Sequence, residues 1–203
     1  YDVTSYTTID PDQNFDTDTS FYYYWRVQAM DNAGDGTFSA SGRSASVRAF
    51  KINSTITITM LNDTVIFGNL TSGSSATTLG NNTSPILNPG PFIIQNDGNV
   101  HVNVSVNASD ALWLQQGLST EYFQFMSNWS ETESGSFWRN LSATVWTNVP
   151  PVTTYTIALA LLNYSNTNDT GEVEIHVKVP PDEPGGYKSS TVNFISSLGS
   201  NTL

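Results

Sequence analysis

The sequence predicts an all-β protein, built as an antiparallel β-sandwich or jelly roll of the immunoglobulin-like kind. Apolar residues alternate with polar ones at a period of two along several segments, such as 100–106 and 173–179. Clusters of Pro, Gly, Asn and Asp separate these segments, for example at 89–91, 96–98 and 180–186. Period-two alternation is typical of strands that bury one face, and frequent turn signals are typical of short antiparallel strands.

Each element follows from its own pattern. Residues 56–60, 100–106 and 173–179 are each expected to form a strand with one buried face and one solvent-exposed face. Residues 155–162 are almost entirely apolar, which predicts a central strand buried on both faces. Residues 110–117 are the one stretch with helical character, and they are too short to change the fold class.

Composition excludes several classes of function. The 203 residues include 7 Lys and Arg against 18 Asp and Glu, a formal charge of −11, and no Cys. So few basic side chains cannot supply the phosphate contacts that nucleic acids or anionic membranes require, so we expect neither as a partner. Without Cys there is no disulfide, thiolate nucleophile or Cys-based metal site. The longest apolar run, 157–162, is too short for a membrane span.

The chain changes character near residue 50. No Asn-X-Ser/Thr triplet precedes this point and eleven follow it, so we expect two domains, residues 1–50 and 51–203. In the first, the aromatic run YYYWRVQAMDNAGDG followed by SASVRAF resembles the C-terminal half of a fibronectin type III module. The resemblance implies the last three strands of a seven-stranded sandwich, with Tyr23, Trp25, Val27 and Ala29 facing its core.

An incomplete sandwich leaves an unpaired strand edge that something must cover. Either the first domain is an excerpt of a longer chain, or a strand from a neighbouring copy completes the missing part. The N-terminal segment has the extended, period-two character of a donated strand. The expected assembly strand consists of Val3, Ser5, Thr7 and Ile9.

Acidic side chains alternate just after this segment, at Asp10, Asp12, Asp16 and Asp18, with Asn14 between them. Closely spaced oxygen ligands of this kind are what Ca²⁺ prefers, so a calcium loop is one interpretation. The turn glycine and the downstream bidentate Glu of an EF-hand are missing, and a solvated acidic loop is the other interpretation. Beyond this Ca²⁺ ion we expect no cofactor.

The larger domain carries an excess of N-glycosylation acceptor triplets. With 20 Asn, 25 Ser and 25 Thr in the chain, chance would give about five such triplets. We expect them all on solvent-exposed faces or loops, where an attached glycan needs them; an Asn-rich surface without sugar is the alternative. The predicted acceptors are Asn53, Asn62, Asn69, Asn81, Asn82, Asn103, Asn107, Asn128, Asn140, Asn163 and Asn168.

The segment ILNPGPFIIQNDGNVHVNVSVNAS resembles the central portion of archaeal surface β-sandwich domains and, more distantly, the jelly-roll subunits of TasA-type matrix fibres. The proline-rich turn and last strand in VPPDEPGGYKSSTVNFISS fit the same kind of domain. This resemblance implies an extracellular fibre, coat or appendage subunit at the cell surface.

No catalytic pattern is recognisable. His101 and His176 are expected on polar strand faces, and neither belongs to a zinc or triad motif. Glu131 and Glu133 are spaced like a glycosidase pair in a Ser-rich loop, where solvated carboxylates are the simpler interpretation. Exposed tryptophans would favour sugar binding, and Trp129 is the one expected to be most exposed.

We therefore expect a structural protein and not an enzyme. The leading hypothesis is an extracellular, N-glycosylated archaeal surface filament, a homopolymer in which copies of the chain complete one another by strand exchange. The alternative is an excerpt of a modular adhesin, S-layer-type or carbohydrate-binding surface protein.

Overall fold

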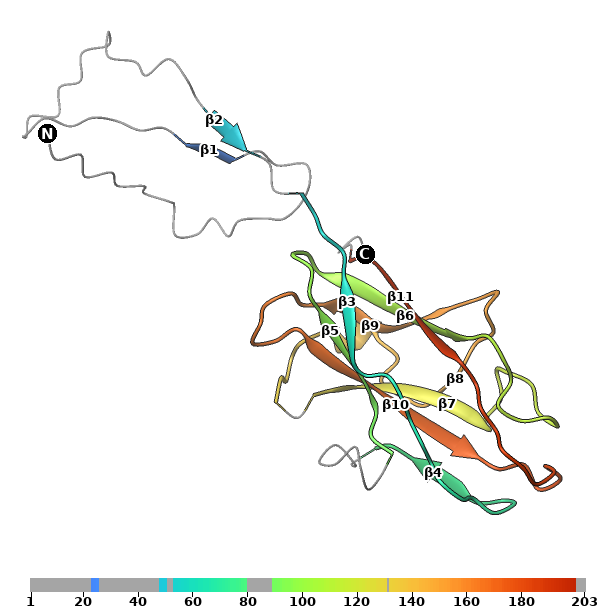
Figure 1. Ribbon diagram of the computed structural model, residues 1–203. Coiled ribbons are helices and arrows are strands. Elements are labelled where there is room, and N and C mark those ends of the chain that lie inside the picture. Colours follow the sequence, from blue (N-terminus) through green and yellow to red (C-terminus); the bar gives the residue numbers. More distant parts are fainter. Residues whose placement is uncertain (1–22, 26–47, 51–52, 80–88, 131, 200–203) are drawn as a thin grey trace, which may run out of the picture. The chain divides into compact units, whose positions relative to one another are not determined.

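The computed structural model describes residues 23–25, 48–50, 53–79, 89–130 and 132–199. The chain divides into two compact units, residues 1–54 and 55–203, which are described separately (Figure 1). In the first unit, strand β1 (Tyr23–Trp25) pairs antiparallel with β2 (Arg48–Phe50), and Tyr23 lies opposite Phe50.

The described part of the second unit contains nine strands and one short 3-10 helix, η1 (Arg139–Leu141). The strands are β3 (Ile58–Asn62), β4 (Ser75–Thr77), β5 (Phe92–Asn96), β6 (Val102–Ala108), β7 (Phe123–Trp129), β8 (Thr147–Asn148), β9 (Thr156–Leu162), β10 (Thr170–Lys178) and β11 (Val192–Leu198).

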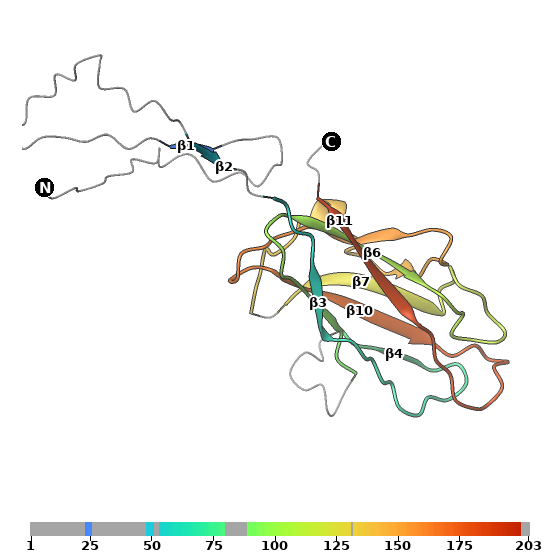
Figure 2. The same ribbon diagram turned by 45° about the horizontal axis from the view of Figure 1, so that its top comes forward.

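These strands form two antiparallel sheets packed face to face, which confirms the predicted all-β sandwich. One sheet has the order β3-β5-β10-β7-β8, with β4 pairing with β10 beyond the end of β5. The other has the order β11-β6-β9. Figures 1 and 2 both show β10 beside β7 in one layer and β6 beside β11 in the other.

The core lies between the sheets and follows the predicted period of two. Val102, Val104 and Val106 of β6 are fully buried, as are Val173 and its alternate neighbours on β10. Phe125 on β7 is the largest fully buried side chain. Apolar burial of this extent is the main favourable term in the stability of the sandwich.

The tight turn at residues 96–99 connects the two sheets. The fully buried Asn96 side chain donates to the carbonyl oxygens of Val100 (2.9 Å) and Leu162 (3.0 Å), and accepts from the N–H of Gly98 (3.0 Å). A Cβ atom on Gly98 would lie 2.2 Å from the Thr55 carbonyl oxygen, so the close approach of the chain entering β3 requires glycine.

The apolar segment 155–162, which was predicted as a central strand, is largely buried but contains an edge strand. β9 is the edge strand of the three-stranded sheet, and its residues 158–162 are all buried. Residues 136–143 run along its outer edge and cover it. The N–H of Trp138 donates to the Ala160 carbonyl (2.8 Å) and the N–H of Ala143 to the Ile157 carbonyl (3.3 Å). This segment therefore supplies the cover that a neighbouring strand would give.

Other sequence expectations were wrong locally. Residues 110–117 form bends without a helix, because Trp113 is buried in the core and its Nε1 donates to the Tyr122 carbonyl (2.9 Å). The polar faces of two strands are not solvated as expected: Ser105 on β6 and Glu172 and Glu174 on β10 are buried. Other segments pack over these faces.

Candidate functional site

The edges of the two sheets differ in how they are protected. An unpaired edge strand exposes backbone N–H and C=O groups that can pair with another chain. The edge at β9 is covered by residues 136–143, and the edge at β8 is only two residues long. Along β11, no described residue pairs with the seven-residue outer edge.

β11 has none of the usual devices that prevent strand addition. Its sequence VNFISSL contains no charged residue and no proline. Ile195 and Leu198 are about half exposed, at 47% and 50%. Natural edge strands are usually blunted by lysine, proline or a bulge, so an uncharged and apolar edge of this length favours pairing with another strand.

A groove opens between β11 and β3, the edge strand of the other sheet. It has a volume of about 360 Å³ and is lined by Ile58, Met60, Asp63, Phe92, Val192, Asn193 and Phe194. We call this groove, together with the free edge of β11, the β3–β11 seam. The Phe92 and Phe194 rings meet edge to face across it, with their centroids 5.2 Å apart.

The apolar residues of the seam are incompletely buried. Ile58 and Met60 on β3 and Val192 and Phe194 on β11 pack against the core, yet each stays partly exposed. In register, Val192 and Phe194 share the inner face of their sheet with Ala108 and Val106, which are fully buried. A further strand beside β11 would lie about 4.8 Å outward and would cover the exposed side of this groove.

The predicted glycan acceptors fall into three environments. Asn53, Asn69 and Asn140 are exposed, Asn107 is buried, and the rest of those described are partly buried. N-glycosylation modifies the side-chain Nδ2, so both the exposure of the side chain and the contacts of that atom matter.

Two of these amide nitrogens donate to backbone carbonyl oxygens. The Asn107 side chain is only 3% exposed, and its Nδ2 donates to the Thr154 carbonyl (3.2 Å) while its Oδ1 accepts from Asn193 (2.9 Å). The expectation that Asn107 lies on a solvent-exposed face is wrong, because the segment around Thr154 covers that part of β6. Asn62 Nδ2 donates to the Pro91 carbonyl (2.7 Å).

Three other acceptor asparagines use their side-chain oxygen in hydrogen bonds from backbone N–H groups. Asn103 Oδ1 accepts from the N–H of Leu161 (2.9 Å), where a bulge in β9 gives Leu161 a φ of 51° and frees that N–H from the ladder. Asn163 Oδ1 accepts from the next two N–H groups in an Asx turn. Asn128 lies on strand β7, where its Oδ1 accepts from the N–H of Trp129 and its side chain also donates to the Glu174 carboxylate. Asn168 is partly buried in the loop before β10.

The outer face of β10 holds ionisable groups whose pKa values are shifted. Glu174 is fully buried, and burial raises the pKa of its carboxyl, while hydrogen bonds from Thr78 and Asn128 oppose that shift. His176 beside it was expected to be exposed, but it is partly buried under Trp146, and desolvation lowers its pKa. These groups belong to sheet packing, because Thr78 Oγ1 also accepts from the N–H of Ile175.

The remaining candidates show no catalytic arrangement in the part of the chain that the structure describes. Glu133 is partly buried and its carboxylate accepts from the N–H of Thr170 (2.7 Å), so it fastens a loop. His101 is exposed, as expected. Trp129 is partly buried beneath Arg139, and among the tryptophans whose burial is described Trp138, at 44%, is the exposed one. Among the described residues, no cluster of three His, Asp or Glu could hold a metal ion.

Several sequence candidates lie outside the described residues: Val3, Ser5, Thr7, Ile9, Asp10, Asp12, Asp16, Asp18, Asn81, Asn82 and Glu131. The assembly strand, the calcium loop and two glycan acceptors therefore stay predictions. No helix among the described residues is long and apolar enough to cross a membrane.

Comparison with known proteins assigns no family. No protein-family model matches the chain, and neither a curated protein nor a solved structure is significantly similar to it. Any functional assignment must therefore come from the seam, the acceptor asparagines and the surface of the sandwich.

Proposed function

We propose that this chain is a structural subunit of an extracellular, N-glycosylated surface filament of archaeal type, assembled by strand complementation between copies. The observation that carries the proposal is the β3–β11 seam, an uncharged seven-residue edge beside an incompletely buried apolar groove. Strand addition to such an edge combines backbone hydrogen bonds with alternate side chains that enter the groove.

The proposed occupant is the segment 3–9 of a second copy. Its seven residues equal the seven residues of β11, and Val3, Ser5, Thr7 and Ile9 would all face one side of an added strand. The apolar Val3 and Ile9 would lie about 20 Å apart along such a strand, so one of them would cover the partly exposed Ile58 and Met60 and the other would lie beyond the groove. Because donor and acceptor are different surfaces, the contact is heterologous and can repeat into an open polymer.

Two changes should separate donor from acceptor. Deleting residues 1–9 removes the donor and leaves the groove. Met60→Glu places a second carboxylate in the groove, which Asp63 already lines. Covering this unpaired charge would cost several kcal/mol, while the free subunit can keep the carboxylate in water. Ile66→Glu is the matched control, because Ile66 is 72% exposed and does not line the groove.

Electron microscopy and size-exclusion chromatography give the result. We expect filaments from the unchanged chain and from Ile66→Glu, and monomers from each of the other two variants alone. Mixing those two should give a one-to-one complex that cannot grow, because one variant keeps the donor and the other keeps the groove. Filaments of normal length from the deleted chain would refute strand complementation, and a native mass of 22.1 kDa would refute glycosylation.

A carbohydrate-binding module of a larger adhesin is the second candidate. Three exposed aromatic side chains favour it: Tyr187 at 93%, Tyr155 at 68% and Trp138 at 44%. Exposed rings of this kind can stack on sugars, since the face of an aromatic ring attracts polarised C–H groups. Retention of the unchanged chain on immobilised polysaccharide, together with an absence of filaments, would favour this function over the first.

A further inference from the structure

One acceptor asparagine lies beside an exposed aromatic ring. In the segment Trp138-Arg139-Asn140-Leu141-Ser142, Asn140 is exposed and begins the triplet, and Trp138 precedes it by two residues. Consecutive Cα atoms are 3.8 Å apart, so the two Cα atoms are separated by at most about 7.6 Å. Trp138 and Leu141 are large apolar side chains that remain exposed, at 44% and 39%.

The backbone holds this segment in one conformation. Trp138 donates its N–H to the Ala160 carbonyl (2.8 Å), and its own carbonyl accepts from the N–H of Leu141 (3.2 Å). Ser142 Oγ donates to the Trp138 carbonyl (2.8 Å) and accepts from the N–H of Ala160 (2.9 Å). The ring at Trp138 and the amide at Asn140 are thus presented from a turn fixed to the edge of β9.

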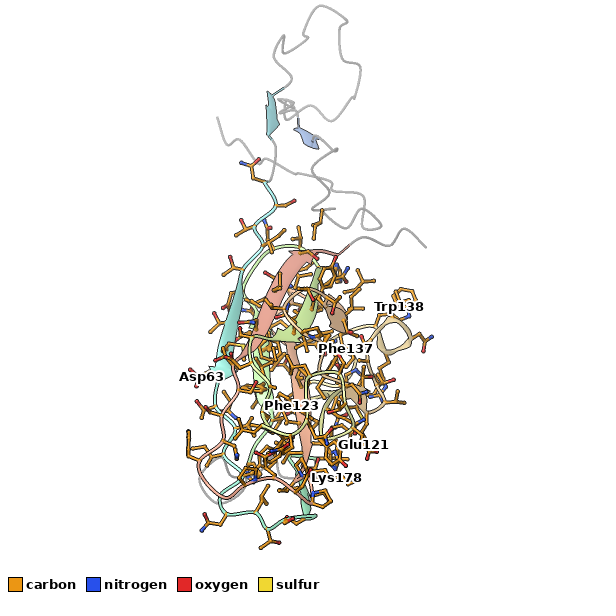
Figure 3. All side chains as sticks on the ribbon, turned by 90° about the vertical axis from the view of Figure 1, so that its right-hand side faces the viewer. Asp63, Glu121, Phe123, Phe137, Trp138 and Lys178 are labelled. Atoms are coloured by element: carbon orange, nitrogen blue, oxygen red, sulfur yellow. The ribbon has the colours of Figure 1, made fainter. Side chains whose placement is uncertain are left out.

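The side chain of Arg139, between Trp138 and Asn140, lies against a second tryptophan. The Arg139 guanidinium lies over the Trp129 ring, 4.8 Å from its centroid, and Trp129 packs against the buried Phe137. Trp138 precedes the 3-10 turn in an extended conformation, with φ −85° and ψ 99°. Arg139 lies against Trp129, whereas Trp138 and Asn140 are exposed to solvent, and Figure 3 shows Trp138 projecting outward while Phe137 points inward.

We propose that Asn140 is an occupied glycan site whose first sugar packs on the indole face of Trp138. The inference rests on the glycosylation in the proposed function. The ligand chemistry is a β-linked pyranose of the N-acetylhexosamine class, whose axial C–H groups form an apolar face that an indole ring attracts. The sugar would also cover Leu141 and hold residues 136–143 against the edge of β9.

A second triplet has the same spacing and provides an internal control. Phe67 precedes the exposed Asn69 by two residues, in Phe67-Gly68-Asn69-Leu70-Thr71. The Phe67 ring is partly buried and packs against the core, so less of it is open to a sugar than at Trp138. Sequence spacing alone does not separate the two sites, whereas the exposure of the ring does.

The experiment uses the full chain secreted from a host that attaches N-glycans and trimmed enzymatically to single N-acetylglucosamine residues. Peptide mass mapping gives the occupancy of Asn140. Melting temperatures are then compared for the unchanged chain, Asn140→Gln, Trp138→Ala and the double variant, with Asn69→Gln as the control. Trp138→Phe keeps an aromatic face and should retain the sugar's effect.

We expect Asn140→Gln to lower the melting temperature by about 2–4 °C when Trp138 is present and to have no effect on Trp138→Ala. NMR should show the acetyl methyl of one N-acetylglucosamine shifted upfield by the ring current, and this shift should disappear in Trp138→Ala. Additive effects without a shifted methyl resonance, at an occupied Asn140, would overturn the packing inference alone. An Asn140 without a glycan also overturns the packing inference. The proposed glycosylation fails as well only if none of the acceptor asparagines carries a glycan.

Discussion

The buried side chain of Asn96 gives the sharpest test of how the two sheets are held together. It makes three hydrogen bonds, two as donor to the Val100 and Leu162 carbonyls and one as acceptor from Gly98. Asn96→Ala removes all three and leaves their partners in a site where Asn96 itself is 1% exposed. With about 1 kcal/mol per lost bond and a further penalty for unpaired buried groups, the cost should be about 3–5 kcal/mol.

This loss should lower the melting temperature by about 6–20 °C, because 1 kcal/mol corresponds to about 2–4 °C in a domain of this size. Tryptophan fluorescence is a suitable probe, since four of the five tryptophans belong to the second unit. Asn166→Ala is the control, because Asn166 is exposed in a loop. Equal melting temperatures for the two alanine variants would refute this account of the turn.

The remaining predictions concern β10. Burial raises the pKa of the Glu174 carboxyl above 4.5, so the folded chain keeps this carboxyl protonated to a higher pH than the unfolded chain does. The stability that the bound proton contributes is therefore lost as the pH rises from 4.5 through the raised pKa. Glu174→Gln should therefore gain stability relative to the unchanged chain as the pH rises above 4.5, and parallel urea-unfolding profiles would contradict this. Gly171→Ala should destabilise by about 1–3 kcal/mol, because its Cβ would lie 2.8 Å from Leu159 Cδ1. Gly117→Ala, with no atom within 4 Å, is the control, and equal urea midpoints would refute the clash.

The sequence predicts which residues share a strand face but not whether that face is covered. On β10, Val173 and Ile175 point inward as the alternation requires. Glu172 and Glu174 occupy the other face as expected, yet they are buried, because Thr78 and other chain segments pack over them. The period-two alternation of apolar and polar residues within a strand carries no information about the segments that cover it, because those segments come from distant parts of the chain.

The order of the strands in the sheets also could not be predicted from the alternation of apolar and polar residues. The apolar run in β9 correctly indicated burial on both faces, but the cover on its outer side is irregular chain with no periodicity of its own. The β3–β11 seam joins strands that are more than a hundred residues apart in the sequence. Only the pairing of the sheets brings these strands to one side of the sandwich, so the candidate groove was not predictable from local patterns.

The two edges of the three-stranded sheet also bear on where glycans and subunits can coexist. In the proposed filament an incoming strand uses β11, and Asn140 lies on the segment that covers the opposite edge at β9. A sugar at Asn140 therefore leaves the seam open. Asn62 ends β3 beside the groove residue Asp63, where a glycan would block the entry of a strand. The Asn62 Nδ2 already donates to the Pro91 carbonyl. This hydrogen bond therefore holds the end of β3 and also favours an Asn62 without a glycan beside the seam.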